Sequence, residues 1–144
     1  MKKIITAFLA ILFFGMLLNC SSRNNREPHV QREWMLISFG DFTKDQLIKK
    51  KAKIDLTAEK EGGKIKGSAF MGCNRIFFTM EFKNKRKVKI SGLGSTEMMC
   101  NDMNLETLFL ESFEKMTKYS VDGHFLTLTD DKGNVMKFVA ADWD

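Results

Sequence analysis

The stretch GSAFMGCNRIFFTMEF, Gly67 to Phe82, holds the clearest strand pattern in the chain. From Ile76 onward every second residue is apolar, which is typical of a strand with one buried face. On the segment before it, Gly67 shares a face with Ile65, and a glycine there indicates a bulge or the close approach of another part of the backbone. The stretch therefore predicts two strands, with Cys73 at the end of one.

Alternation of the same kind extends in both directions from this stretch. The other alternating positions are Trp34, Leu36, Ile54, Leu56, Val88, Ile90 and the segments 119–121, 125–129 and 135–139. Turn residues separate these segments, and we expect Gly92 and Gly94 to end the strand that contains Ile90. The pattern predicts seven or eight short antiparallel strands.

One segment, 102–116, changes to helical spacing. Its apolar stripe is Leu105, Leu108, Phe109, Phe113 and Met116. We expect Asp102 to be the N-cap, Lys115 and Lys118 to lie at the C-terminal end, and Glu106 to face away from the stripe. The stripe then packs on the sheet. The predicted fold class is mainly antiparallel β with one packed α-helix (α+β), as a small curled sheet or incomplete barrel.

The N-terminus is typical of an export signal. Lys2 and Lys3 precede an apolar run, Ile4 to Leu18, that is shorter than the roughly 20 residues a membrane-spanning helix needs. The run ends at Leu17-Leu18-Asn19-Cys20, which resembles the lipobox of bacterial lipoproteins, although Asn19 stands where glycine, alanine or serine is usual. The alternative is an ordinary signal peptide in which Cys20 is incidental.

These features divide the chain into three parts. We expect residues 1–19 to be a lipoprotein signal peptide, residues 20–32 to be a lipidated Cys20 with a flexible tether, and residues 33–144 to be the folded domain. Acyl chains such as palmitate on Cys20 would anchor the protein stably to a membrane. The expected location is the bacterial cell envelope, at the outer membrane, on its periplasmic side or surface.

Basic residues exceed acidic ones, 23 to 18, and gather in two runs, Lys49–Lys51 and Lys83–Lys87. Such runs can bind nucleic acid, but an exported chain rarely meets any, so we expect no nucleic-acid partner. The simplest interpretation is solvated loops that protect strand edges. Contact with anionic lipid headgroups is a further hypothesis for an anchored protein.

Three cysteines lead to one expected disulfide. With Cys20 acylated, Cys73 and Cys100 remain in a compartment that oxidises thiols. A catalytic redox pair is the weaker interpretation, because such cysteines usually share one short motif at a helix N-terminus. Cys100 does precede the predicted helix, so this alternative stays open.

A copper site is a third interpretation of the same region. Four sulfur side chains cluster there, namely Met98, Met99, Cys100 and Met103. Soft sulfur ligands suit Cu(I), and imidazole could come only from His29 or His124. Methionine is also a flexible core filler and recurs throughout this chain. We therefore expect no metal and no cofactor.

The order of these pieces resembles the META domain, the family of the HslJ-like heat-shock lipoproteins. The likeness rests on Gly72-Cys73-Asn74, then Thr96-x-Met98-x-Cys100, then Glu106 and Phe109 on a helix. It covers residue 33 to about residue 138. The resemblance implies an envelope protein linked to stress resistance, secretion or virulence, with no established catalytic activity.

Binding is the function that the apolar residues favour. The sequence has no nucleophile elbow, His-x-x-x-His helix or glycine-rich phosphate loop, so we expect no enzyme and no catalytic residues. The adjacent Phe77 and Phe78 must point to opposite faces of their strand. The outward ring then lies either in a satellite cluster beneath a loop or at the mouth of an apolar groove between helix and sheet, lined by Phe77, Phe78, Phe109 and Phe113.

The favoured function is a non-catalytic, lipid-anchored protein that binds or supports an envelope component, which could be a protein, a lipid or a peptide. Two alternatives remain. The predicted fold also resembles that of type III secretion pilotins, which implies a chaperone that holds a lipid tail or peptide in the apolar groove. The other alternative is a copper or redox protein built on the cysteines and methionines.

Overall fold

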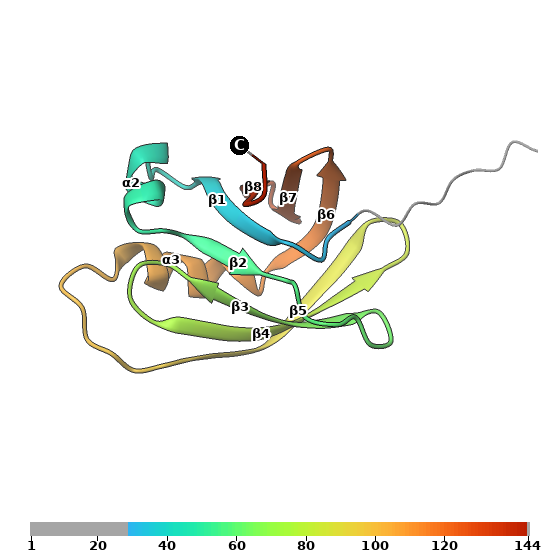
Figure 1. Cartoon of the computed structure of the whole chain (residues 1–144), viewed down its shortest axis with the longest axis horizontal. Helices are drawn as coiled ribbons and strands as arrows, with labels where there is room; N and C mark the ends of the chain where they lie inside the picture. Colours follow the sequence, from blue (N-terminus) through green and yellow to red (C-terminus); the bar gives the residue numbers. More distant parts are fainter. Residues whose placement is uncertain (1–28, 144) are drawn as a thin grey trace, which may run out of the picture.

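The computed structural model describes residues 29–143, which form an antiparallel barrel with two short helices (Figure 1). The strands are β1 (Glu33–Phe39), β2 (Lys53–Asp55), β3 (Lys64–Phe70), β4 (Arg75–Lys83), β5 (Lys87–Ser95), β6 (Met116–Asp122), β7 (Phe125–Asp130) and β8 (Val135–Ala140). The helices are α2 (Lys44–Lys49) and α3 (Asn104–Phe113). The mainly antiparallel fold with a packed helix is thus confirmed.

The signal peptide and Cys20 lie outside the described residues, whereas the last part of the predicted tether lies within them. Val30 is buried, and its carbonyl oxygen accepts a hydrogen bond from Trp34 Nε1 at 2.9 Å. The backbone N–H of Leu56 donates to the carbonyl oxygen of Arg32 at 3.0 Å. The folded domain therefore begins ahead of Glu33. Within residues 29–143, no helix is long and apolar enough to cross a membrane.

Strand β4 supplies the centre of the core, as its alternation predicts. Ile76, Phe78 and Met80 are buried, and Phe78 pairs with Gly67 on β3. A Cβ atom added to Gly67 would lie 2.5 Å from the Phe78 ring, so the ring occupies the place of a side chain. The close approach predicted at Gly67 is confirmed, and it explains why this position is glycine.

The β4–β5 ladder contains a bulge instead of the predicted break. Phe77 pairs with Gly94 and Thr79 pairs with Ser91, so β5 has one residue more than β4 between these pairs. Gly92 has a φ of 66°, a left-handed conformation that glycine adopts without strain. Because the bulge absorbs this residue within the ladder, β5 continues to Ser95, and the prediction that Gly92 and Gly94 end the strand is wrong.

Helix α3 packs its apolar side into the barrel. Leu105, Phe109 and Phe113 are fully buried, and the Phe113 ring lies 4.9 Å from the Phe78 ring, edge to face. The helix ends at Phe113, because Met116 is extended and pairs with Asp130 on β7. This corrects the prediction that the helix reaches residue 116, with Lys115 and Lys118 at its C-terminal end.

The N-cap of α3 and one residue of its predicted stripe also differ from expectation. The N-cap is Met103, and Asp102 Oδ1 instead accepts a hydrogen bond from the Asn104 N–H at 3.2 Å. Leu108 is partly exposed at 36%. It lies against Gly40 in the loop that follows β1.

Helix α2 was not predicted, although its sequence carries a start signal. Thr43 is the N-cap, and its hydroxyl accepts a hydrogen bond from the Gln46 N–H at 3.3 Å. The Gln46 side chain in turn accepts from the Thr43 N–H at 2.8 Å, which completes a capping box. Leu47 is the buried residue that fixes this short helix to the barrel.

The sheet closes fully, which corrects the expectation of an incomplete barrel. The physical reason is long-range pairing, since β8 pairs with β1 over five positions, from Trp34 with Ala140 to Phe39 with Met136. The weakest seam lies between β5 and β6. Within the described residues, their ladder consists of Lys87 with Lys118, beside a hydrogen bond of 2.9 Å from the Tyr119 N–H to the Arg86 carbonyl oxygen.

Strand directions give the barrel two different ends. The helix end carries α2, the loop after β3, the segment 96–103 before α3, and the β7–β8 turn. The N-terminal end carries residues 30–33, the β2–β3, β4–β5 and β6–β7 turns, and the chain beyond β8. Figure 1 shows the start of the described chain and the β4–β5 turn on the same side of the molecule.

Candidate functional site

Most of the residues that carry the family resemblance meet at the helix end, around the buried side chains of Asn74 and Glu106, in a group here named the Asn74 cluster. Its members are Cys73, Asn74, Thr96, Met98, Cys100 and Glu106. Cys73 and Cys100 form a disulfide with their Cα atoms 6.1 Å apart. The predicted disulfide is therefore confirmed, and it joins the loop after β3 to the segment before α3.

Asn74 is the centre of this cluster. Its amide oxygen accepts hydrogen bonds from the Thr96 hydroxyl at 2.8 Å and from the Met98 N–H at 2.7 Å. Its amide nitrogen donates to Glu106 Oε1 at 2.8 Å and to the Met98 carbonyl oxygen at 3.1 Å. All four hydrogen-bonding positions of the amide are thus used, as expected for a side chain that is 2% exposed.

Glu106 was predicted to face away from the core, and this prediction is wrong. The side chain is 2% exposed, and its Oε2 accepts a hydrogen bond from the Asn74 N–H at 2.6 Å. Helical spacing carried the signal, because Glu106 lies three residues before Phe109 and seven before Phe113, on the same face. The sequence reasoning missed it because a carboxylate was assigned to the solvent by type.

The Asn74 cluster connects the loop after β3, the segment 96–103 and α3. Its polar side chains form hydrogen bonds with other members of the cluster. Both thiols are consumed by the disulfide. Next to it, Met98 is 57% exposed and Met99 is 98% exposed. The two histidines lie elsewhere: His29 at the start of the described chain, and His124 stacked on Trp143. Among residues 29–143, no group of three or more His, Cys, Asp or Glu side chains could hold a metal ion.

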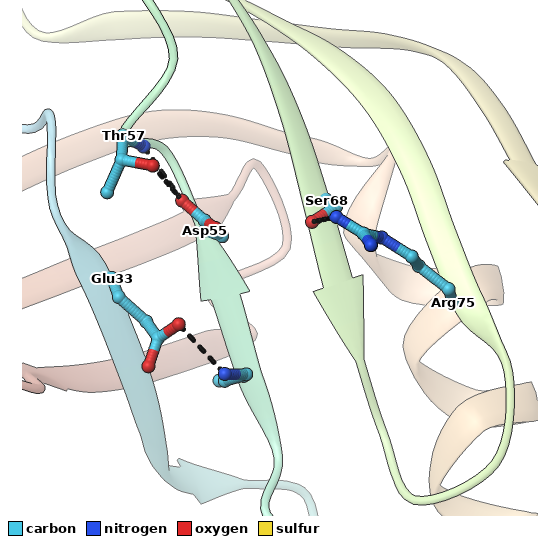
Figure 2. Close-up of polar contacts among 6 residues, drawn as sticks. Glu33, Asp55, Thr57, Ser68 and Arg75 are labelled. Carbon is cyan, nitrogen blue, oxygen red and sulfur yellow. Dashed lines mark hydrogen bonds and ion pairs between the residues drawn. The ribbon is translucent and has the colours of Figure 1, made fainter.

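A second polar group lies outside the barrel, on β2, β3 and β4. The register places Asp55 beside Ser68, and Ser68 beside Phe77, so one row crosses three strands. Figure 2 shows Asp55 and Thr57 facing Ser68 and Arg75 across this surface. These side chains border a hollow of about 460 Å³ whose floor includes Gly67 and Gly92. We name it the outer hollow.

Charges of both signs flank the outer hollow. Arg75 Nη2 donates to Ser68 Oγ at 3.4 Å, and the Arg75 guanidinium lies 5.6 Å from the centre of the Phe77 ring. On the other side, Asp55 Oδ1 accepts from the Thr57 hydroxyl at 2.6 Å and from the Thr57 N–H at 2.9 Å. The hollow therefore presents a cation, a carboxylate and an aromatic ring together.

The carboxylate of Asp55 is held in its charged form. The Thr57 hydroxyl bond is the main cause of a lowered pKa for Asp55, and the Thr57 N–H and the charges of Lys53 and Arg75 act in the same direction, while partial burial opposes them. A carboxylate with a lowered pKa is a weak general base. The arrangement suits recognition of a charged or polar partner better than proton transfer.

The four phenylalanines of the predicted groove do not lie together. Phe78, Phe109 and Phe113 are buried in the barrel core, where the Phe109 and Phe113 rings stack at 4.5 Å. Phe77 points outward and is 47% exposed. The predicted groove is therefore wrong, because α3 closes directly onto β4 and leaves these three rings in contact. The prediction that Phe77 and Phe78 point to opposite faces is confirmed.

Sequence reasoning missed the polar members of the outer hollow. Asp55, Ser68 and Arg75 come from three different strands, and only the strand register brings them side by side. The one local signal was Asp55-x-Thr57 at the end of β2, a spacing at which aspartate binds the backbone two residues on.

The structure defines a class of small antiparallel barrel with a disulfide and a buried polar cluster under one helix. The family profile of the META domain matches residues 27–143, most of the chain. The chain therefore belongs to the META domain family, as the Gly-Cys-Asn and Thr-x-Met-x-Cys motifs indicate.

Solved structures show the same fold at low sequence identity. A protein from Burkholderia xenovorans, solved by NMR, is similar with a TM-score of 0.59 and 20% identity, over 78% of this chain and 83% of that chain. A duf4847 family protein from Bacteroides vulgatus ATCC 8482, seen in a crystal structure, has a TM-score of 0.50 and 17% identity, over 79% and 95%. No curated protein matches the sequence.

Proposed function

We propose that this META domain protein is a non-catalytic, lipid-anchored protein of the bacterial cell envelope that binds a polypeptide partner at the outer hollow. The observation that carries the proposal is the exposed Phe77 beside Arg75 at the edge of the hollow. Exposed aromatic and arginine side chains are the residue types that most often dominate binding energy at protein interfaces. The proposed role serves envelope stress resistance or secretion, as the resemblance to the HslJ-like lipoproteins implies.

The composition of the outer hollow favours a polypeptide over a lipid tail. Asp55, Lys66 and Arg75 line it together with serine and threonine side chains, and it is open to the surface. An acyl chain needs an enclosed apolar lining, whereas a peptide offers backbone amides and carbonyl groups to charges of both signs. Phe77 supplies the apolar contact for one side chain of the partner.

The binding site can be tested by photo-crosslinking in intact cells. A photoreactive phenylalanine analogue is placed at Phe77, and in a matched control at Val135, which is 45% exposed on β8, four strands away in either direction around the barrel. We expect an envelope protein to be crosslinked from position 77 and not from position 135. Arg75→Glu should reduce that adduct severalfold, because it reverses the charge beside the ring.

Equal adducts from both positions, or an adduct at 77 that Arg75→Glu leaves unchanged, would contradict the proposed site. The anchor is tested separately, by the intact mass of protein purified from its native membrane. An acyl-glycerol addition that Cys20→Ser abolishes is the expected result. An unmodified Cys20 would refute the anchor and leave the binding site to stand on the crosslinking result.

A further inference from the structure

The N-terminal end of the barrel carries an unusual basic turn. The β4–β5 turn joins Lys83 to Lys87, and the whole segment Lys83–Lys87 is exposed. Lys83 lies 3.9 Å from Glu81, whereas Lys85, Arg86 and Lys87 form no ion pair with any described residue. Three positive charges are therefore available at one turn.

The backbone of this turn is strained by the residues that occupy it. Lys85 has a φ of 61° and Arg86 a φ of 59°. Glycine and asparagine adopt this left-handed conformation readily, whereas long side chains rarely do. Lys85 and Arg86 therefore occupy positions that glycine or asparagine would favour, and they place two positive charges at the tip of the turn. Backbone strain of this kind is often found at functional positions.

An exposed tryptophan lies at the same end. Trp143 follows β8, is 46% exposed, and stacks on His124 of the β6–β7 turn with ring centres 4.8 Å apart. Phe125 meets the same indole edge to face at 5.5 Å, so the ring is held in place from two sides. Tryptophan is the side chain most characteristic of the boundary between lipid headgroups and acyl chains.

The chain toward Cys20 also leaves from this end. Val30 is the first buried residue among residues 29–143, and it lies ten positions after Cys20 in the sequence. Even a fully extended chain of this length spans only about 35 Å, so an acylated Cys20 keeps the N-terminal end close to the bilayer. The helix end, with Lys49–Lys51, points the other way.

We infer that the N-terminal end of the barrel docks on an anionic lipid bilayer through the Lys85–Arg86–Lys87 turn and Trp143. This inference deepens the proposed function, because it rests on the lipid anchor that brings this end to a membrane. The basic turn contacts the phosphate groups and Trp143 enters the headgroup layer. Glu59 and Glu61, on the neighbouring β2–β3 turn, are exposed. An anionic surface repels these carboxylates, so the barrel tilts and its β6–β7 side lies nearest the bilayer.

The test uses the chain from residue 20 with Cys20→Ser, so that binding does not depend on acylation. Sedimentation with phosphatidylcholine vesicles, with or without phosphatidylglycerol, compares Lys85→Gln/Arg86→Gln/Lys87→Gln with a control of equal charge change, Lys44→Gln/Lys49→Gln/Lys51→Gln at the helix end. Each basic side chain near an anionic surface changes partitioning about fivefold. We expect the turn variant to lose at least tenfold in partitioning to anionic vesicles, and the control variant less than threefold.

A second measurement reports on geometry rather than charge. Trp34 is fully buried and Trp143 is 46% exposed, so brominated lipid vesicles should quench the fluorescence of Trp143 selectively. Trp143→Phe should abolish the quenching, and the turn variant should reduce it. Equal weakening by the two triple variants, absence of binding to anionic vesicles, or quenching that survives Trp143→Phe would overturn the docking proposal. None of these results would test acylation of Cys20, which the intact mass decides.

Discussion

The helix end and the N-terminal end of the barrel hold their chain segments in opposite ways. At the helix end, the loop after β3 and the segment 96–103 are joined by the Cys73–Cys100 disulfide and by a buried asparagine whose hydrogen bonds are all made within the protein. At the N-terminal end, the β4–β5 turn exposes its charges on a strained backbone. One end satisfies its polar groups internally, and the other presents them outward.

This difference indicates that the helix end contributes mainly to stability and that the N-terminal end contributes mainly to contact with partners. Buried polar groups that are fully satisfied fix one arrangement of the chain, and they are costly to disturb. Exposed charges add little to stability, because water solvates them well. Substitutions at the helix end should therefore act mainly on the free energy of unfolding, and substitutions at the N-terminal end mainly on binding.

The largest expected effect is removal of the disulfide. Cys73→Ser/Cys100→Ser should lower the free energy of unfolding by about 3.5 kcal/mol, from the entropy of a loop that spans a sequence separation of 27. Denaturant unfolding of the variant, and of the wild-type chain under reducing conditions, measures the loss. A loss below about 1 kcal/mol in both experiments would mean that hydrogen bonds alone hold the helix end. The disulfide would then not distinguish the stability of the helix end from that of the N-terminal end.

Glu106→Gln should have the next largest effect. The glutamate accepts from both nitrogen atoms of Asn74, so a glutamine NH₂ must face a donor and leave buried groups unsatisfied. We expect a loss of about 1 to 3 kcal/mol in thermal or denaturant unfolding. The matched control is Glu111→Gln on the exposed side of α3, which should change stability by less than about 0.5 kcal/mol. Equal losses for the two variants would contradict the role of the Asn74 cluster.

Acid should loosen the helix end through Asp130 at the start of the β7–β8 turn. The Asn134 side chain is the main cause of a lowered pKa for Asp130, whose ordinary value is 3.8, and backbone N–H groups of the turn add to it. A lowered folded-state pKa gives stability that is present above the ordinary value and is lost as pH falls through the folded value. Unfolding measured from pH 6 to pH 2 should show this loss, and Asn134→Ala should make it smaller. An unchanged pH dependence would refute the assignment.

The smallest effect should be seen at the N-terminal end and should have the opposite sign. Lys85→Gly removes the strain of a left-handed backbone, so the free energy of unfolding should rise by about 0.5 kcal/mol while binding to anionic vesicles falls. Lys89→Gly is the control, because Lys89 lies in extended β5 and glycine there should destabilise by roughly 0.5 to 1 kcal/mol. A loss of stability in Lys85→Gly would show that the turn is not strained.

Local periodicity predicted the parts of the fold that local burial controls. The stripe on β4 and the burial of Phe109 and Phe113 follow from the identity and spacing of large apolar side chains. Closure of the barrel could not be predicted in this way, because no local pattern encodes the pairing of β1 with β8. Helix α2 was missed because six residues rich in lysine give little periodicity, although its capping box was present.

The candidate sites also divide into features that the local sequence predicts and features that depend on long-range strand pairing. Compartment and cysteine number predicted the disulfide, and the adjacency of Phe77 and Phe78 predicted that their rings point to opposite faces of the strand. The outer hollow depends on strand register, and a shift of one residue would send Arg75 or Asp55 to the other face. Glycine is ambiguous for a related reason, since Gly92 at positive φ is compatible with a bulge or with a strand end until its neighbours are known.

The pairing of β1 with β8 has a consequence for how the chain matures. These strands come from opposite ends of the described domain, whereas β3, β4 and β5 are consecutive and the disulfide encloses only the second and third of them. Contacts between nearby segments form faster than contacts between distant ones. We therefore expect the cross-linked hairpin to assemble first, and the free edges of β1 and β7 to stay available to chaperones until the last strand arrives.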